Sequence, residues 1–190
     1  MGEKVSRVLP KIFRIQTTAV IHEYNRSCRR IPLISLEKYD NLNDKLQQIV
    51  ESVVKYFDAK FARIWLVDKE REYMILKFSA GKYKNIYGEF SKVPVSSFKI
   101  GQIVKTKKPA ITNDVVNDPR IEHPEWARKE KLKSFAGYPL FHNRDAIGVL
   151  AMFSEKKLHL VDFEILGIFC NQISKELKSF FEAQEFLSVK

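Results

Sequence analysis

The residues that could do chemistry are few, and none forms a recognised catalytic or metal-binding arrangement. His123-Pro124-Glu125, with Asp118 upstream, offers an imidazole and carboxylates that could suggest a metal site. Structural metal sites use a second spaced pair of ligands, which this loop lacks. A Ser/His/Asp hydrolase needs a nucleophile elbow or a comparable context, and none is present. We therefore expect no metal site and no catalytic residues.

The two cysteines, Cys28 and Cys170, lie far apart in the chain. Neither belongs to a Cys-x-x-Cys motif, and neither has a histidine at ligand spacing. Cys170 falls within the apolar pattern of the last predicted helix, which favours a packed thiol. Two unpaired thiols are typical of a reducing compartment, so we expect a cytoplasmic location.

The basic charge of the chain is concentrated at its beginning. The net charge is +10, and residues 1–36 carry seven basic and two acidic residues, or half of that excess. Such a segment can attract nucleic acid, an anionic membrane or acidic partners, although a solvated helix face is the more ordinary explanation. No aromatic or glycine-rich RNA motif accompanies the charge, so nucleic acid is not expected. No apolar run reaches ~18 residues, so no membrane span is expected.

The elements that must position any site follow from length and periodicity. A chain of 190 residues with 45% hydrophobic residues suits one domain with an added helical segment. The pattern predicts helices over 4–28 and from 40 or 41, a hairpin of strands 61–67 and 73–80, a short helix over 98–107, a strand over 110–113, a short helix over 124–132, a hairpin of 134–141 and 146–153, and a last helix over 160–186. Hairpins pair antiparallel strands, so the fold class is α+β.

Two details of this pattern bear on a site. Phe61, Arg63 and Trp65 face one side of the first strand and Ala62 and Ile64 the other. Both sides are mainly apolar, which is typical of a central strand covered on both faces. Residues 81–97 form a long connection, and such connections in compact domains are usually functional or mobile.

Several short motifs occur in an order that resembles the GAF domain, the small-molecule sensor module of signalling proteins. Residues 41–182 carry the resemblance, and no single motif would be specific without the others. The motifs are Ile100-Gly101-Gln102-Ile103-Val104, Lys108-Pro109-Ala110-Ile111-Thr112-Asn113-Asp114, Asp118-Pro119-Arg120, Ser134-Phe135-Ala136-Gly137-Tyr138-Pro139-Leu140 and Ile147-Gly148-Val149-Leu150, followed by Phe163, Leu166, Phe169 and Ile173 on the closing helix.

The resemblance implies a six-stranded antiparallel sheet with helices on both faces, a ligand pocket beneath the short helices, and a dimer made by the end helices. It also implies two domains of the chain: an N-terminal helical extension and linker over 1–36, and a GAF-like domain over 37–190. Gly148 within a strand would let a neighbouring backbone approach closely.

The same resemblance argues against three known activities of GAF domains. Only Asp162 matches the signature of the cyclic-nucleotide-binding members. Residues 81–153 contain no cysteine, which disfavours covalent bilin attachment and methionine sulfoxide reduction.

By the resemblance, the ligand-binding residues are Phe98, Asp114, Trp126, Arg128, Ser134 and Tyr138. Aromatic walls with a few polar groups suit a small ligand, and Arg128 could bind a carboxylate or phosphate. The alternative is that Phe98 and Trp126 fill the cavity as core, and that Asp114 only fixes its loop through local hydrogen bonds.

We therefore expect a non-enzymatic sensor domain of signal transduction that binds an unidentified small molecule and acts through the packing of helices in a homodimer. The alternative is a ligand-free interaction or dimerisation module that docks acidic partners through its basic N-terminal helix. The sequence identifies no cofactor, ligand or signalling partner chain.

Overall fold

The computed structural model describes residue 36, residues 39–97 and residues 99–188, with side chains up to residue 179. The predicted helix over 4–28 and the linker after it lie outside the described residues, apart from Leu36. The proposed domain boundary at residue 36 therefore stays a prediction.

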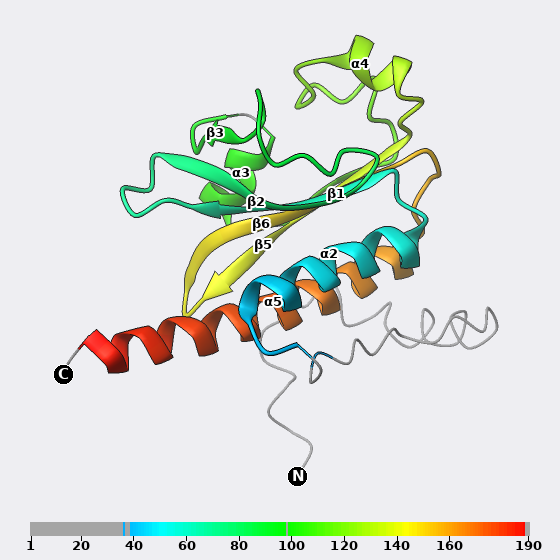
Figure 1. Cartoon of the computed structure of the whole chain (residues 1–190). Helices are drawn as coiled ribbons and strands as arrows, with labels where there is room; N and C mark the ends of the chain where they lie inside the picture. Colours follow the sequence, from blue (N-terminus) through cyan, green and yellow to red (C-terminus); the bar gives the residue numbers. More distant parts are fainter. Residues whose placement is uncertain (1–35, 37–38, 98, 189–190) are drawn as a thin grey trace. The chain divides into compact units, whose positions relative to one another are not determined.

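The described residues form helices and strands in the predicted order. The elements are α2 (Leu42–Phe57), β1 (Phe61–Val67), β2 (Tyr73–Gly81), β3 (Lys92–Pro94), α3 (Ile100–Thr106), β4 (Ala110–Thr112), α4 (Pro124–Lys129), β5 (Ser134–His142), β6 (Asp145–Ser154) and α5 (Leu160–Ser188). Figure 1 shows them along the chain.

The strands make one six-stranded sheet in the order β3-β2-β1-β6-β5-β4, and every neighbouring pair is antiparallel. This confirms the predicted α+β fold with a six-stranded antiparallel sheet. It also confirms that β1 is central, since β2 and β6 flank it. The sequence pattern missed β3, because a three-residue edge strand ending in proline has no room for alternation.

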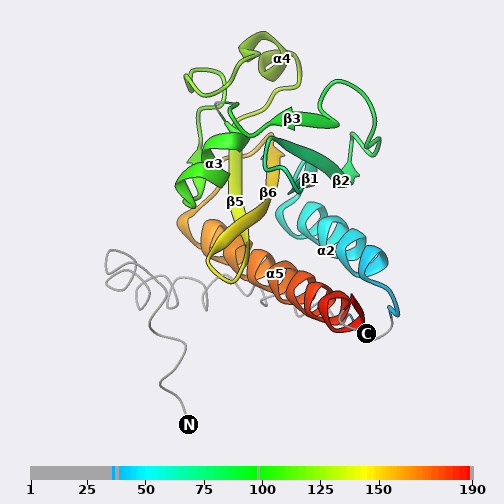
Figure 2. The ribbon, with the colours of Figure 1, turned by 90° about the vertical axis from the view of Figure 1, so that its left-hand side faces the viewer.

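One face of the sheet is covered by α2 and α5, which lie side by side (Figure 2). Asn41 caps α2, and its side-chain oxygen accepts a hydrogen bond of 2.9 Å from the backbone N–H of Asp44. Leu46, Ile49 and Leu166 are fully buried against the sheet. No helix in the described part of the chain is long and apolar enough to cross a membrane.

The opposite face carries α3, α4 and the long connection around β3, which together we call the roof (Figure 1). Helices therefore lie on both faces, as predicted. The roof is irregular, since α3 and α4 have seven and six residues and the segments between them lack regular structure.

Two features of the sheet fix which side chains face the roof. A Cβ on Gly148 would lie 2.4 Å from the backbone oxygen of Trp65, which confirms the predicted close approach. Ile64 pairs with Phe78 whereas Trp65 pairs with Leu76, so Lys77 is an extra residue in β2. This bulge reverses the alternation of β2 and lets both Leu76 and Ser79 share the roof side with β1 residues.

Candidate functional site

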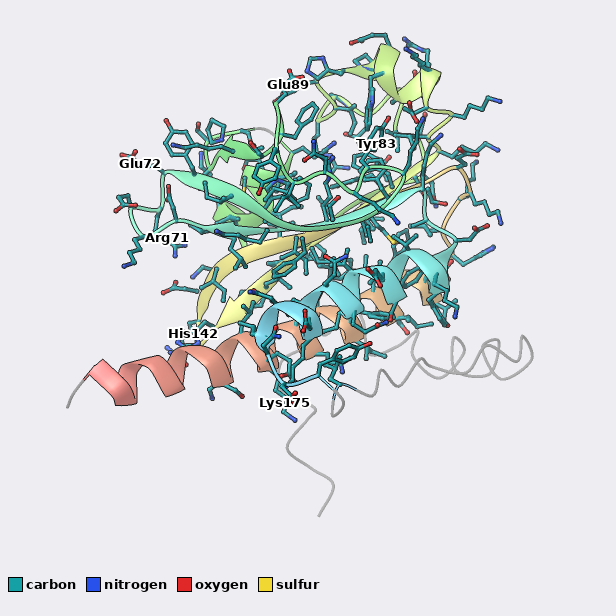
Figure 3. All side chains as sticks on the ribbon, in the orientation of Figure 1. Arg71, Glu72, Tyr83, Glu89, His142 and Lys175 are labelled. Atoms are coloured by element: carbon teal, nitrogen blue, oxygen red, sulfur yellow. The ribbon has the colours of Figure 1, made fainter. Side chains whose placement is uncertain are left out.

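The candidate site is a cavity of about 160 Å³ between the sheet and the roof. Side chains of β1 and β6 form its floor, and the connection after β2, the residue before α3, the loop before α4 and α4 itself enclose it. Its lining residues are Phe61, Arg63, Trp65, Tyr83, Phe90, Val93, Ser97, Lys99, Ile100, Arg120, Ile121, Glu122, His123, Trp126 and Phe153. In Figure 3 the labelled Tyr83 lies between the sheet and α4.

Aromatic rings make up much of the cavity wall. Phe61 and Phe153 stand on neighbouring strands and stack with ring centroids 4.9 Å apart. Tyr83 contacts Phe61 edge to face at 5.1 Å, and Trp126 contacts Phe153 in the same way at 5.7 Å. The rings come from β1, β6, the long connection and α4, so the cluster holds the roof to the sheet through its own packing.

Trp65 fixes the long connection above the cavity. Its indole Nε1–H donates a hydrogen bond of 3.0 Å to the backbone oxygen of Phe90. The Phe90 side chain is 44% exposed, so the connection borders solvent at this point. This side-chain bond adds to the backbone hydrogen bond of 2.8 Å from Leu76 N–H to the oxygen of Ser91, so the sheet holds this wall of the cavity at two neighbouring residues.

Two cationic side chains reach into the aromatic cluster. The Arg63 guanidinium lies over the rings of Phe61, Trp65 and Tyr83 at 5.4, 5.9 and 5.7 Å from their centroids. The Lys99 ammonium lies over the ring of Phe153 at 4.3 Å and that of Phe135 at 4.8 Å. The negative faces of aromatic rings attract such cations, although the attraction is weaker than that of a full negative charge.

Burial lowers the pKa of both cations. For Arg63 the loss of water around the guanidinium is the main cause. For Lys99 the same cause lowers the pKa to about 8, against smaller opposing effects from Glu122 and Asp118. The field of Arg120 lowers it further. The surroundings of the cavity therefore disfavour the charged forms of Arg63 and Lys99. The protein nevertheless places both side chains there.

Arg120 lies at the rim and has a carboxylate partner, which neither Arg63 nor Lys99 has among the described residues. Its Nε and a terminal nitrogen donate to the two oxygens of Asp118 at 2.8 and 2.6 Å. The hydrogen bonds from Arg120 lower the pKa of Asp118 to about 2. This bidentate pair closes the loop before α4 and leaves the Arg120 charge largely neutralised.

Glu130 ties the end of α4 to the rest of the domain. Its buried carboxylate accepts hydrogen bonds from Lys82 at 2.6 and 2.9 Å and lies 3.1 Å from the Lys60 ammonium. These contacts, with Lys82 first, lower the pKa of Glu130 to about 2. The cluster joins the residue before β1, the connection after β2 and α4, and so supports one side of the cavity.

Of the six predicted ligand-binding residues, the structure brings Trp126 to the cavity. Phe98 lies outside the described residues. The other four lie elsewhere, for reasons that the local geometry makes clear.

Arg128 belongs to the same short helix as Trp126 but faces away from the cavity. Two residues turn an α-helix by about 200°, so the inward direction of Trp126 turns Arg128 outward. Arg128 is exposed and borders a shallow depression that Val116 and Glu155 also line. Arg128 is therefore not among the residues that line the cavity, and its role in ligand binding stays a prediction.

Ser134 and Tyr138 point away from the cavity, toward the face of the sheet that α2 and α5 cover. Phe135, between them in β5, packs with Phe153 on the roof side, so alternation directs Ser134 and Tyr138 toward the helices. The Tyr138 hydroxyl donates to the backbone oxygen of Phe163 in α5 at 2.8 Å, and the Ser134 hydroxyl donates to that of Lys156 at 2.7 Å. Both side chains fasten the sheet to neighbouring segments.

Asp114 is exposed and organises its own loop. Its two carboxylate oxygens each accept a hydrogen bond of 3.0 Å from the side-chain nitrogen of Asn117. Its backbone N–H donates to the hydroxyl of Thr112 at 3.1 Å. These contacts favour the role of Asp114 in fixing its own loop over a role in ligand binding. The donor to its carboxylate is the side-chain amide of Asn117, where backbone N–H groups were expected.

The loop that could have suggested a metal site has no such cluster. His123 Nδ1 lies 3.4 Å from Glu125 Oε1, while Asp118 is engaged by Arg120. Among the residues that the structure describes, no group of three or more His, Cys, Asp or Glu side chains could hold a metal ion.

Sequence reasoning missed the two cations that distinguish the cavity. Arg63 gave a signal, since it is a charged residue in the otherwise apolar face of a central strand, beside Phe61 and Trp65. Lys99 gave none, because a lysine near the start of a short helix is ordinary on a protein surface. Only the three-dimensional path of the connection before α3 directs it inward.

The fold and the cavity define an α+β domain with a small, partly open cavity on the face opposite its two long helices. The model of the GAF domain family matches residues 40–177. The chain therefore belongs to the GAF domain family. Domains of this family occur in signalling proteins and are generally regulatory. No curated protein matches the chain at a significant level.

Solved structures share this fold at low sequence identity. The GAF domain from an Acinetobacter phosphoenolpyruvate-protein phosphotransferase is 16% identical, with a TM-score of 0.66 over 93% of this chain and 99% of the other. A methyl-accepting chemotaxis protein fragment is 19% identical, with a TM-score of 0.61 over 75% and 92%. A free methionine-R-sulfoxide reductase from Neisseria meningitidis, solved with its substrate, is 19% identical, with a TM-score of 0.65 over 78% and 84%.

Proposed function

We propose that this chain is a non-enzymatic sensor domain of signal transduction that binds a small molecule in the cavity between sheet and roof. The observation that carries the proposal is the cavity itself: an aromatic enclosure of about 160 Å³ with two cations over its rings. Small-ligand sites combine apolar walls with a few polar groups in this way. A core that served packing alone would have little reason to keep Arg63 and Lys99 there.

Thiol chemistry finds little support in the described residues. Cys170 is the cysteine that they include, and it is buried in α5 on the helix face of the sheet. Burial raises the pKa of its thiol well above the ordinary value. Reductases of methionine sulfoxide need a reactive thiolate, and burial makes Cys170 a poor one. This supports binding rather than turnover.

The proposed output is a change in helix packing within a homodimer. Leu160 and Ile168 of α5 are 60% and 44% exposed, and large exposed apolar side chains on one helix suit a contact with a second copy. β5 and β6 connect the cavity floor to α5, so a ligand that binds two arrangements unequally can bias that contact. The homodimer, a signalling partner chain and the cytoplasmic location stay predictions.

A screen of common metabolites by thermal shift, followed by calorimetry, tests ligand binding. We expect one or more compounds to raise the melting temperature of the full chain. Trp126→Leu should reduce that shift, because it removes a ring from the cavity wall. Arg128→Gln on the outer side of the same helix is the matched control and should keep it. If no compound stabilises the chain, and a crystal structure shows the cavity filled by its own side chains, the proposal fails.

The alternative function, docking through the basic N-terminal segment, concerns residues that lie almost entirely outside the described part of the chain. Removal of residues 1–36 separates the two functions. It should leave small-molecule binding intact if the cavity is the site, whereas it should abolish partner binding or dimerisation if that segment is the docking element.

A further inference from the structure

The cavity holds more positive charge than its own acids neutralise. Its described lining includes Arg63, Lys99 and Arg120 but a single acidic residue, Glu122, which is exposed. Asp118 neutralises Arg120 from the rim. Within the described residues, neither Arg63 nor Lys99 has a carboxylate at ion-pairing distance. The remaining charge therefore belongs to these two side chains.

Arg63 has most of its hydrogen-bonding capacity unused. In the described part of the chain its recorded hydrogen bond runs from Nε to the hydroxyl of Ser79 at 3.3 Å, which is long for such a bond. A guanidinium carries five N–H donors, so donors remain for a group inside the cavity. The bulge in β2 helps here, since it places Ser79 opposite Arg63 and fixes the base of the side chain.

Lys99 approaches the same ring stack from the roof. Its ammonium lies over Phe153, Phe153 stacks on Phe61, and Arg63 lies over Phe61. The two cations thus border one continuous aromatic surface, Arg63 from the sheet and Lys99 from the segment before α3. Removing two cations from water costs free energy that ring faces recover only in part, whereas an anion between them would recover much more.

The size of the cavity limits what the anion can be. About 160 Å³ is well below the ~300–1,000 Å³ of sites for drug-sized ligands. A nucleotide with base, sugar and phosphate would have to extend out of this volume into solvent. A single flat ring with one charged group suits both the volume and the walls, because aromatic walls bind flat apolar bodies by stacking and edge contacts.

We propose that the ligand of this cavity is a small aromatic carboxylate, whose carboxylate binds Arg63 and Lys99 and whose ring packs among Phe61, Trp126 and Phe153. The proposal rests on the proposed sensor function and adds the chemical class of its ligand. The guanidinium of Arg63 matches the two oxygens of a carboxylate, and Lys99 contributes a point charge. Binding needs no covalent step.

Calorimetric titrations of the full chain with paired probes test this class. The probes are benzoate and phenylacetate, the neutral amides benzamide and phenylacetamide, and inorganic phosphate. We expect each acid to bind at least about tenfold more tightly than its amide, as charge-assisted hydrogen bonds require. Inorganic phosphate should bind more weakly than the acids, since it lacks a ring.

Two substitutions assign the preference to the two cations. Arg63→Gln and Lys99→Met should each remove most of the difference between acid and amide. Lys105→Met, an exposed lysine of α3, is the matched control and should keep it. Circular dichroism checks folding, and Lys99→Met alone suffices if Arg63→Gln does not fold.

Three results would overturn the inference. Amides that bind as tightly as the acids would mean a neutral ligand, and the sensor proposal would stand. Phosphate that binds as well as the acids, with the same sensitivity to Arg63 and Lys99, would remove the aromatic part of the assignment. Failure of both acids to bind at millimolar concentration would exclude this ligand class, and the metabolite screen would then decide separately whether the cavity binds anything.

Discussion

The two faces of the sheet differ in how their side chains pack. Toward α2 and α5, the sheet packs through apolar side chains: Ile49, Leu150 and Leu166 are fully buried, and the Tyr138 hydroxyl has its acceptor in α5. Toward the roof, the same strands present a cavity and the cations Arg63 and Lys99. The comparison teaches that the helix face is packed for stability, whereas the roof face keeps two cations among aromatic rings at a cost in stability, as the proposed binding site requires.

The largest change in stability should come from a substitution on the helix face of the sheet. Leu166→Ala removes a fully buried side chain between α5 and the sheet, and should lower the free energy of unfolding by about 2–5 kcal/mol. Ile168→Ala, two positions along the same helix and 44% exposed, should cost well under half as much. Urea unfolding at low protein concentration measures both. Equal losses would contradict the view of a tightly packed helix face.

A substitution on the roof face should raise the stability instead of lowering it. Lys99→Met should stabilise the ligand-free chain by about 1–3 kcal/mol near neutral pH, because it removes a half-buried charge that has lost most of its water, at the expense of its contacts with two rings. Lys105→Met on the exposed side of α3 should change stability by at most about 0.5 kcal/mol. Thermal and urea unfolding compare the two variants.

The gain in stability from Lys99→Met should depend on pH. The folded pKa of Lys99 is lowered from 10.5 to about 8, so between these values the unfolded chain binds more protons than the folded one. The destabilising contribution of Lys99 is therefore complete below about pH 8 and disappears as the pH rises toward 10.5. The advantage of the variant should shrink across that window. A constant advantage would mean that Lys99 has the same pKa in the folded and unfolded chain, so that its position in the cavity carries no charge penalty.

The smallest effect should come from Tyr138→Phe. This change removes the hydrogen bond to the backbone oxygen of Phe163 and keeps the ring, so the expected loss is about 0.5–1.5 kcal/mol. Since Tyr138 faces the helices, the affinity for benzoate should not change. Calorimetry on the variant checks this, and a large loss of affinity would bring Tyr138 back as a binding residue.

The sequence was enough to predict the fold but only part of the site. Hairpin spacing and apolar periodicity predicted the antiparallel sheet, and the ordered motifs predicted its six strands, including one that periodicity could not reveal. The residues of a motif in a strand, however, alternate between faces, so a motif such as Ser134–Leu140 does not tell which of its members reach a cavity. Phe135 faces the roof, whereas Ser134 and Tyr138 do not.

The roof was the harder part to predict, because it has little periodic structure. The position of Lys99 depends on how a non-repetitive segment crosses the sheet, and its neighbours in the sequence are not its neighbours in space. Arg63 was different, since a charged residue within an apolar strand can be recognised without coordinates. A charged side chain on the covered face of a central strand should be treated as a candidate site residue.

Both tryptophans of the chain, Trp65 and Trp126, line the same cavity. All indole emission of the protein therefore originates where the ligand is proposed to bind, and the hydrogen bond from Trp65 to the Phe90 carbonyl links one of these fluorophores to the segment above it. Intrinsic fluorescence can thus follow occupancy and opening of the enclosure in real time without an added label.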